Sequence, residues 1–280
     1  MEIKNFTMFF DAFPPLSCQV PCTMYGTLLE HGLIEDPFWR MNELKYTALS
    51  EKDCVFESHF PVDTATLSKD HVYLEFYGLD TLCNVYLNEK KLAYTSDMHR
   101  FYSFDVKEKL ACGDNTLRLE FLSPTAYAAA MNNKCFLWHN PDTIPGAAHL
   151  RKSICMFGWD WAPKLPDMGI FRKIELNTYN TDKIEDISVL QHHKHGTVEL
   201  EIAVTTRHHS DSEIYFSIAG QQVKLENGTG TLTIENPKLW WVRGYGEQYL
   251  YNAEVTLVHA GKTIDTATKK IGLRTLDVST

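Results

Sequence analysis

The sequence predicts an all-β protein built from two consecutive β-sandwich domains. Apolar and polar residues alternate over many short stretches, and turn-forming residues separate these stretches from one another. Helical periodicity is confined to two short segments, at 23–31 and 126–131. Short strands separated by turns favour a sandwich or jelly roll over a parallel α/β sheet. The chain has 280 residues, of which 44% are hydrophobic, so it is long enough for two packed domains.

Period-two alternation predicts the strands of the first domain. Val72, Leu74 and Phe76 point to one side of a predicted strand, and the residues between them point to the other. The same pattern recurs in three further stretches, namely 83–87, 117–121 and 170–179. Turn-forming residues separate these stretches, as at 113–115. We expect this domain to span residues 1–180.

A second series of strands follows the turn at 180–182. Residues 198–204 alternate between apolar and polar or small side chains, which predicts a half-exposed strand. About seven short strands within roughly 100 residues are typical of an immunoglobulin-like sandwich. We expect this domain at 181–280, and without a disulfide, because the last cysteine of the chain is Cys155.

The stretch 124–168 lacks a convincing strand pattern. It nevertheless holds three of the six tryptophans, Trp138, Trp159 and Trp161, together with several prolines. Long segments without regular structure inside compact domains are usually functional loops or linkers. Disordered linkers are poor in aromatic residues. A functional loop is therefore the better interpretation.

Asp160 lies between Trp159 and Trp161 in this loop. Indole faces stack on the C–H face of a pyranose, and a carboxylate accepts hydrogen bonds from sugar hydroxyls, each worth about 1.5–3 kcal/mol. These three residues are therefore candidates for a sugar-binding site. The alternative is a tryptophan-rich plug that packs on the sheet, with Asp160 capping a turn. Arg151 and Lys152, just upstream, either brace the loop or lie in solvent.

The residues around Asp160 resemble a signature of the β-mannosidases of glycoside hydrolase family 2. The matching motifs are Phe-Gly-Trp-Asp-Trp-Ala-Pro at 157–163 and Gly-Ile-Phe-Arg at 169–172. Asn-Pro-Lys-Leu-Trp-Trp at 236–241 and Gly-Leu-Arg-Thr at 272–275 resemble elements found more broadly across that family. Ala162 departs from the pattern, because glycine is usual at its position.

The resemblance implies a galactose-binding-like jelly roll followed by an immunoglobulin-like β-sandwich. In the family a (β/α)₈ barrel follows these domains and supplies both catalytic glutamates for retaining hydrolysis of terminal β-D-mannose residues. By resemblance, Asp160 binds hydroxyls of the terminal mannose, and Trp159 and Trp161 shape the pocket. The implied partners are a mannose-containing oligosaccharide and the barrel itself.

The length of the chain bears directly on catalysis. Two β domains and a barrel of about 250 residues do not fit into 280 residues. We therefore expect no catalytic residues in this chain and no hydrolysis by the chain alone. Two alternatives remain open: a free-standing carbohydrate-binding protein, and a structural docking module whose tryptophan loop is an interface.

Charge and composition argue against several other classes of protein. The chain carries 27 basic and 36 acidic residues, and the net charge of −9 argues against a nucleic-acid-binding protein. No apolar run reaches the ~18–20 residues that span a membrane, and the N-terminus lacks a secretory signal. Seven cysteines without metal-ligand spacing indicate reduced thiols and a cytoplasmic protein. His192 and His193 face opposite ways on a strand, so we expect neither a metal nor a cofactor.

Overall fold

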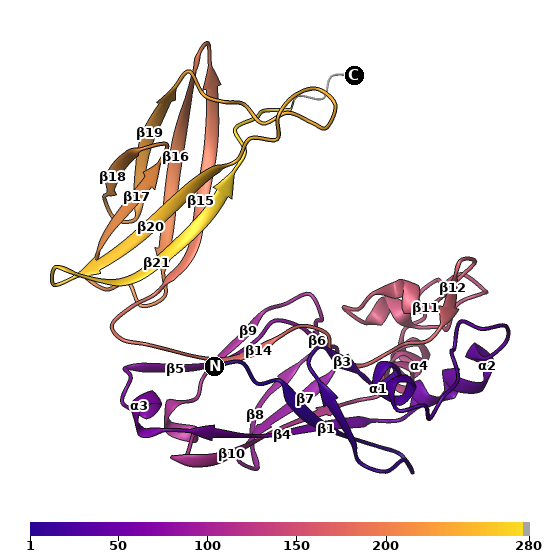
Figure 1. Ribbon diagram of the computed structural model, residues 1–280. Helices are drawn as coiled ribbons and strands as arrows, with labels where there is room; N and C mark the ends of the chain where they lie inside the picture. The colour runs from indigo at the N-terminus through magenta and orange to yellow at the C-terminus, as the bar shows by residue number, and fades with distance from the viewer. Residues whose placement is uncertain (277–280) are drawn as a thin grey trace. The chain divides into compact units, whose positions relative to one another are not determined.

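The computed structural model describes residues 1–276 and divides the chain into two compact units (Figure 1). The division lies between Thr178 and Tyr179, two residues before the boundary expected at residue 180. Both units consist mainly of antiparallel β-strands, as the sequence predicted. Each unit has its own cluster of buried hydrophobic residues.

The first unit contains fourteen strands and four short helices. The strands are β1 (Asn5–Phe10), β2 (Leu16–Gln19), β3 (Cys22–Thr23), β4 (Cys54–Val62), β5 (His71–Phe76), β6 (Leu79–Asp80), β7 (Cys83–Leu87), β8 (Lys90–Thr95), β9 (Tyr102–Asp105), β10 (Gly113–Phe121), β11 (Phe157–Trp159), β12 (Ala162–Lys164), β13 (Gly169–Ile170) and β14 (Ile174–Tyr179). The helices are α1 (Met24–Glu30), α2 (Glu43–Tyr46), α3 (Thr64–Leu67) and α4 (Pro124–Lys134). Single 3-10 turns lie at Thr47–Glu51, Lys107–Lys109, Ala147–His149 and Ile154–Met156.

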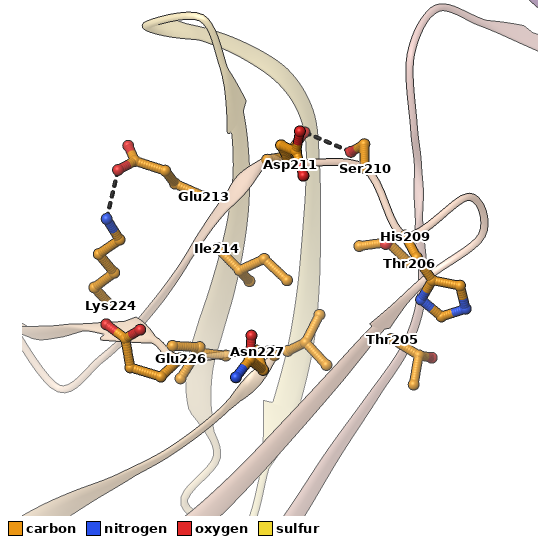
Figure 2. A pocket seen from close by; sticks show the side chains of 14 residues that line it. Thr205, Thr206, His209, Ser210, Asp211, Glu213, Ile214, Lys224, Glu226 and Asn227 are labelled. Carbon is orange, nitrogen blue, oxygen red and sulfur yellow. Dashed lines mark hydrogen bonds and ion pairs between the residues drawn. The ribbon is translucent and has the colours of Figure 1, made fainter.

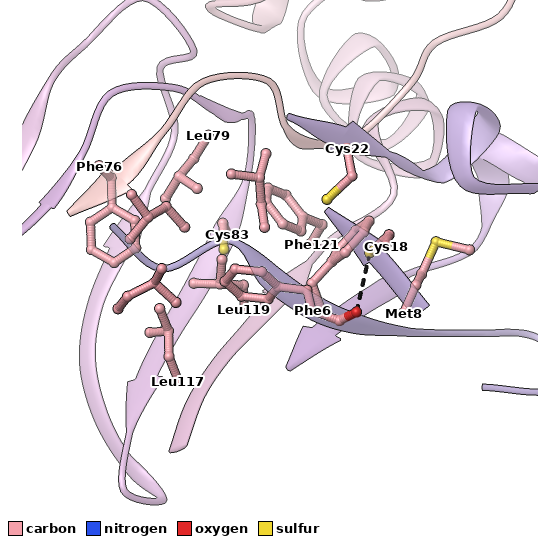
Figure 3. Packing of buried hydrophobic residues seen from close by; sticks show 14 of the residues in the cluster. Phe6, Met8, Cys18, Cys22, Phe76, Leu79, Cys83, Leu117, Leu119 and Phe121 are labelled. Carbon is pink, nitrogen blue, oxygen red and sulfur yellow. Dashed lines mark hydrogen bonds between the residues drawn. The ribbon is translucent and has the colours of Figure 1, made fainter. Parts of the chain in front are cut away.

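These strands form a sandwich around one core. The larger sheet has six strands in the order β2-β1-β4-β10-β7-β8, and smaller sheets have the orders β14-β5-β9 and β3-β13-β6. Figure 3 shows that side chains from both layers meet in the core, among them Leu119 and Phe121 of β10 and Phe76 of β5. Phe121 packs edge-on against Phe56 of β4, with 5.7 Å between ring centroids.

The two predicted helical segments are both present. α1 agrees with the segment predicted at 23–31, whereas α4 is longer than the one predicted at 126–131. The hydroxyl of Ser123 accepts a hydrogen bond from the backbone N–H of Ala126 at 2.9 Å. Pro124 occupies the first helical position. This cap and this proline start the helix earlier than hydrophobic periodicity alone indicates.

Two predicted strand boundaries differ from the structure. The strand predicted at 170–179 is split, because β13 pairs with β3 and β6 whereas β14 pairs with β5. The turn predicted at 113–115 is instead the start of β10, which pairs with β4 from its first residue. The side-chain oxygen of Asn115 accepts a hydrogen bond from the N–H of Ala111 at 2.8 Å. This hydrogen bond closes the bend that leads into β10.

The described part of the second unit, residues 179–276, is a seven-stranded sandwich. Its strands are β15 (Ile184–Lys194), β16 (Thr197–Thr206), β17 (Glu213–Ile218), β18 (Gln221–Leu225), β19 (Thr229–Glu235), β20 (Tyr251–His259) and β21 (Lys262–Ile271). They form two antiparallel sheets, β15-β16-β19 and β18-β17-β20-β21. Leu200, Phe216 and Leu257 are among the fully buried residues between them. This arrangement agrees with the predicted immunoglobulin-like sandwich.

The cysteines of both the core and the surface are free thiols. Cys18, Cys22, Cys54 and Cys83 are buried, whereas Cys112 and Cys135 are exposed and Cys155 is half-buried. Among the helices that the structure describes, none has the length and apolar character needed to cross a membrane.

Candidate functional site

The predicted sugar-binding residues lie at the tip of a small β-hairpin in the first unit. Trp159 of β11 pairs with Ala162 of β12, so Asp160 and Trp161 are the two residues of the connecting turn. The stretch 124–168, in which we predicted no strand, therefore contains this short hairpin as well as α4. In Figure 1 the hairpin, α4 and α2 lie at the same end of the unit.

The tip of the hairpin is open to solvent. Trp161 is 71% exposed and Trp159 is 46% exposed, so neither indole forms a packed plug. Asp160 is also exposed, and its carboxylate makes no hydrogen bond or ion pair with any residue within 1–276. The carboxylate thus caps no turn. It remains available to accept hydrogen bonds from a ligand.

Two residues of β11 fix the base of the hairpin. Phe157 is fully buried in a small cluster with Leu82, Leu150 and neighbouring apolar residues. Gly158 has φ +104°, and a Cβ atom there would lie 2.7 Å from Cγ of Lys164. A glycine is therefore required at this point, both for its conformation and for the close approach of β12.

A buried ion pair closes the segment that carries the hairpin. Lys152 is 5% exposed, and its ammonium group forms an ion pair with the carboxylate of Asp80 on β6. The same ammonium donates a hydrogen bond to the backbone oxygen of Asp167 at 2.7 Å. Residues 152 and 167 lie on either side of the hairpin, so this contact joins the two ends of the segment. Of the two options left open by the sequence, Lys152 braces the loop.

Asp167 extends this buried cluster. Its carboxylate accepts hydrogen bonds from the backbone N–H groups of Tyr25, at 3.1 Å, and Met168, at 2.8 Å. Burial raises the pKa of Asp167 above its ordinary value, although these hydrogen bonds and the nearby Lys152 ammonium oppose the increase. The upstream neighbour Arg151 differs, because its side chain is 77% exposed and forms an ion pair with Asp97 at 3.4 Å.

A second segment, 36–46, and the adjacent Thr47 contact the hairpin at β12. The backbone N–H of Lys164 donates a hydrogen bond to the carboxylate of Glu43 on α2 at 3.1 Å, and the hydroxyl of Thr47 donates one to the backbone oxygen of Lys164 at 2.9 Å. This segment exposes four large apolar side chains, Phe38, Trp39, Met41 and Leu44. Sequence reasoning missed its proximity to the hairpin, although the adjacent Phe38 and Trp39 after a proline were a visible signal.

The second unit contains a polar hollow of its own. Its volume is about 540 Å³, and polar side chains from the ends of β16, β17 and β18 line it. Figure 2 shows the ion pair of Lys224 and Glu213 on one side and His209 on the other. None of the three predicted site residues lines this hollow. Within residues 1–276 no three His, Cys, Asp or Glu side chains are placed to hold a metal ion.

The paired tryptophans of the second unit pack against their own domain. Trp240 lies against Gly272, where a Cβ atom would come 3.0 Å from Cγ of the indole. The guanidinium carbon of Arg274 lies 4.0 Å from the centre of a Trp241 ring. These contacts give both indoles a structural role.

Comparison with known proteins identifies relatives across the whole chain. The family described as glycosyl hydrolase 2 galactose-binding domain-like matches residues 8–172, and glycosyl hydrolases family 2 matches residues 174–274. β-Mannosidase B of Aspergillus fumigatus is 28% identical and covers 96% of this chain but 33% of its own length. The β-mannosidase of Rattus norvegicus is 26% identical and covers 91% of this chain and 32% of its own length. The chain thus spans about a third of the length of the curated relatives that it matches.

Solved structures agree with this assignment. The β-D-mannosidase of Dictyoglomus thermophilum has a TM-score of 0.88 and 29% identity, covering 99% of this chain and 36% of its own. The exo-chitosanase of Amycolatopsis orientalis has a TM-score of 0.73 at 20% identity, covering 97% of this chain and 33% of its own, a likeness of fold alone. The family matches confirm the predicted order of a galactose-binding-like domain and an immunoglobulin-like domain.

Proposed function

This chain belongs to glycosyl hydrolase family 2, and on that basis we propose that it forms the N-terminal part of a retaining β-mannosidase. In this proposal the chain contributes the hairpin of Trp159, Asp160 and Trp161 to the sugar pocket. The remaining two thirds of such an enzyme supply the catalytic barrel. The chain by itself hydrolyses no β-mannoside.

One observation carries the proposal: an unpaired carboxylate stands between two exposed indoles on a braced hairpin. Asp160 has no partner among residues 1–276, whereas Lys152 and Phe157 hold the base of the hairpin in place. A rigid support lowers the ordering cost of binding. The support is needed because the carboxylate must meet the sugar hydroxyls in a fixed geometry.

The chemistry of the reaction assigns Asp160 a binding role. Retaining hydrolysis uses one carboxylic acid to protonate the leaving oxygen and a second carboxylate, about 5–5.5 Å away, to attack the anomeric carbon. Asp160 accepts hydrogen bonds from hydroxyls of the terminal mannose and thereby holds the anomeric carbon in position. Trp159 and Trp161 cover apolar faces of the sugar and exclude water, which strengthens those hydrogen bonds.

The test uses an active enzyme that contains this chain. It is either the product of the whole gene or a fusion of residues 1–276 to the rest of the Dictyoglomus thermophilum enzyme. Asp160→Ala is expected to lower kcat/KM for nitrophenyl β-mannoside by about 10- to 1,000-fold. Asp142→Ala is the matched control, because Asp142 is an exposed aspartate of the same segment. Unchanged kinetics in Asp160→Ala would refute the sugar-binding role and favour a docking module.

A free-standing carbohydrate-binding protein is the second candidate. The exposure of Asp160 and Trp161 in this chain favours it, because both residues are already accessible to a sugar. Calorimetry with mannose and mannobiose separates the two proposals. An incomplete pocket binds too weakly to be measured in this way, whereas a complete binding module gives a measurable heat of binding.

We also propose that the protein is cytoplasmic. The support is that all seven cysteines are free thiols, including the two exposed ones, Cys112 and Cys135. Thiol labelling of the protein taken directly from cells tests this proposal. Seven reactive thiols after unfolding are expected, and oxidised cysteines in secreted material would contradict it.

A further inference from the structure

We propose that a second pocket beside the hairpin binds the sugar on the leaving-group side of the terminal mannose. This proposal rests on the function proposed above. The pocket, here called the Trp138 pocket, has a volume of about 140 Å³. Trp138, His139, Asn140, Thr143, Ile154 and Trp159 are among the residues that line it.

The fold holds the Trp138 pocket directly against β11. The backbone N–H of Ile144 donates a hydrogen bond to the backbone oxygen of Phe157 at 2.8 Å, which ties the segment after α4 to the hairpin. Gly146 has φ +84°, and a Cβ atom there would lie 2.3 Å from the backbone oxygen of Ala128 on α4. Both contacts lie at the C-terminal end of the segment that carries Trp138, and they hold that end against the hairpin and α4.

Two indoles supply the apolar walls of the Trp138 pocket. Trp138 is 79% exposed, which is the largest exposed fraction of any tryptophan in the described chain, and Trp159 is 46% exposed. Ile154 adds an exposed aliphatic side chain. Aromatic faces of this kind stack on the C–H groups of a pyranose.

The polar residues of the Trp138 pocket suit a hydroxylated ligand. Nδ1 of His139 lies 3.0 Å from the backbone oxygen of Asn140 and must carry the proton, because a carbonyl oxygen only accepts. This leaves Nε2 to exchange a hydrogen bond with a ligand hydroxyl, which can donate or accept. The side-chain oxygen of Asn140 accepts a hydrogen bond from the N–H of Asp142 at 3.0 Å, which leaves its NH₂ group to donate. Two polar side chains between two indoles match a sugar better than an aliphatic side chain of another protein.

Trp159 connects this pocket with the proposed contact for the terminal sugar. It lines the Trp138 pocket and is also the neighbour of Asp160 in the hairpin. Consecutive Cα atoms lie about 3.8 Å apart, which is less than the length of one pyranose unit. The proposal places the terminal mannose of a disaccharide at Asp160 and its second ring in the Trp138 pocket.

Ligand-detected saturation-transfer NMR on the 280-residue chain tests the proposal, because the method detects millimolar binding. The probes are mannose and β-1,4-mannobiose, and the variant is Trp138→Ala. The control is Trp39→Ala, which removes an indole that is 60% exposed and does not line the pocket. In the unsubstituted chain, mannobiose is expected to bind about 2- to 10-fold more tightly than mannose. Trp138→Ala is expected to abolish this difference and leave the affinity for mannose unchanged, and Trp39→Ala is expected to change neither.

The outcomes separate this proposal from the one on which it rests. An unchanged preference for mannobiose in Trp138→Ala overturns the proposed sugar-binding role of the Trp138 pocket. It would assign Trp138 to packing against another protein surface. Absence of any signal from mannobiose in the unsubstituted chain overturns it as well. The role of Asp160 is judged independently by the kinetics of Asp160→Ala in the active enzyme. Trp138 is exposed, so its removal leaves the melting temperature unchanged, which circular dichroism verifies.

Discussion

Lys152 and Arg151 are adjacent in sequence but lie in very different environments. Lys152 is buried with Asp80, whereas the Arg151 side chain extends into solvent. Lys152→Met leaves the Asp80 carboxylate buried without its cation, and we expect the first unit to lose about 3–5 kcal/mol of its free energy of unfolding. Urea titration measures this loss. Arg151→Met is the matched control and is expected to cost less than about 1 kcal/mol, because exposed ion pairs contribute little. Equal losses in the two variants would contradict the bracing role.

Asp182 makes the second unit sensitive to acid. Burial tends to raise the pKa of Asp182, but hydrogen bonds from the backbone N–H groups of Ser210, His208 and Lys183 outweigh it and lower the pKa to about 2. A carboxylate with a lowered pKa stabilises the folded state above its unfolded pKa, near 4. This contribution is lost as the pH falls through the folded value.

We therefore expect acid to weaken the second unit in a defined range. Its free energy of unfolding should fall by about 1–2 kcal/mol between pH 4 and about pH 2, because Asp182 becomes protonated. Asp182→Asn should remove this dependence and lower the stability at neutral pH. Urea unfolding at a series of pH values measures both effects. Asp211→Asn serves as the control, since Asp211 is exposed and follows Ser210, which donates a hydrogen bond to Asp182. A pH dependence that persists in Asp182→Asn would assign it to another group.

At the scale of the element, the β11–β12 hairpin depends on Gly158. Gly158→Ala places a methyl group against Lys164 at a positive φ, and we expect about 1–3 kcal/mol of destabilisation. Amide hydrogen exchange should become faster over residues 157–164 while the large sheet keeps its protection. Gly196→Ala is the control, because Gly196 also has a positive φ, +77°, but no atom lies within 4 Å of the added carbon. Faster exchange throughout the unit would indicate global unfolding instead.

Elements with a strong period of two could be predicted from the sequence. β7, β16 and β17 follow the alternation closely, because each has one face in the core. The hairpin β11–β12 could not be predicted, since strands of three residues contain too little pattern. Composition nevertheless identified Trp159, Asp160 and Trp161 as candidates. The ion pair of Lys152 with Asp80 escaped prediction, because only the folded chain brings these residues together.

At the scale of the whole molecule, each unit has its own core. The second unit buries its apolar residues between its own two sheets. Residues 179–276 are therefore expected to fold alone. This fragment should show a single cooperative thermal transition, at the temperature of one of the transitions of the whole chain. Circular dichroism and calorimetry measure both. A fragment without a cooperative transition would show that its stability depends on the first unit.

The prediction of two β domains without a barrel depended more on the length of the chain than on its composition. Charge and hydrophobic content describe many proteins, whereas 280 residues leave no room for a barrel beside two β domains. The residues that the structure describes form these two β units and no barrel. The spatial arrangement of the exposed apolar segment at 36–46 beside the hairpin was not accessible from the sequence, because it depends on contacts between distant residues.

The contact between Lys152 and the backbone of Asp167 closes residues 153–166 into a loop with a single base. The loop is also tied to its surroundings, because Phe157 packs in the cluster with Leu82 and Leu150 and the backbone of Lys164 contacts Glu43 and Thr47. A replacement of this loop therefore has to keep these contacts as well as the buried ion pair. A transplant of residues 153–166 from a relative, with Lys152, Asp80, Asp167 and Phe157 retained, tests whether this loop sets the proposed sugar preference.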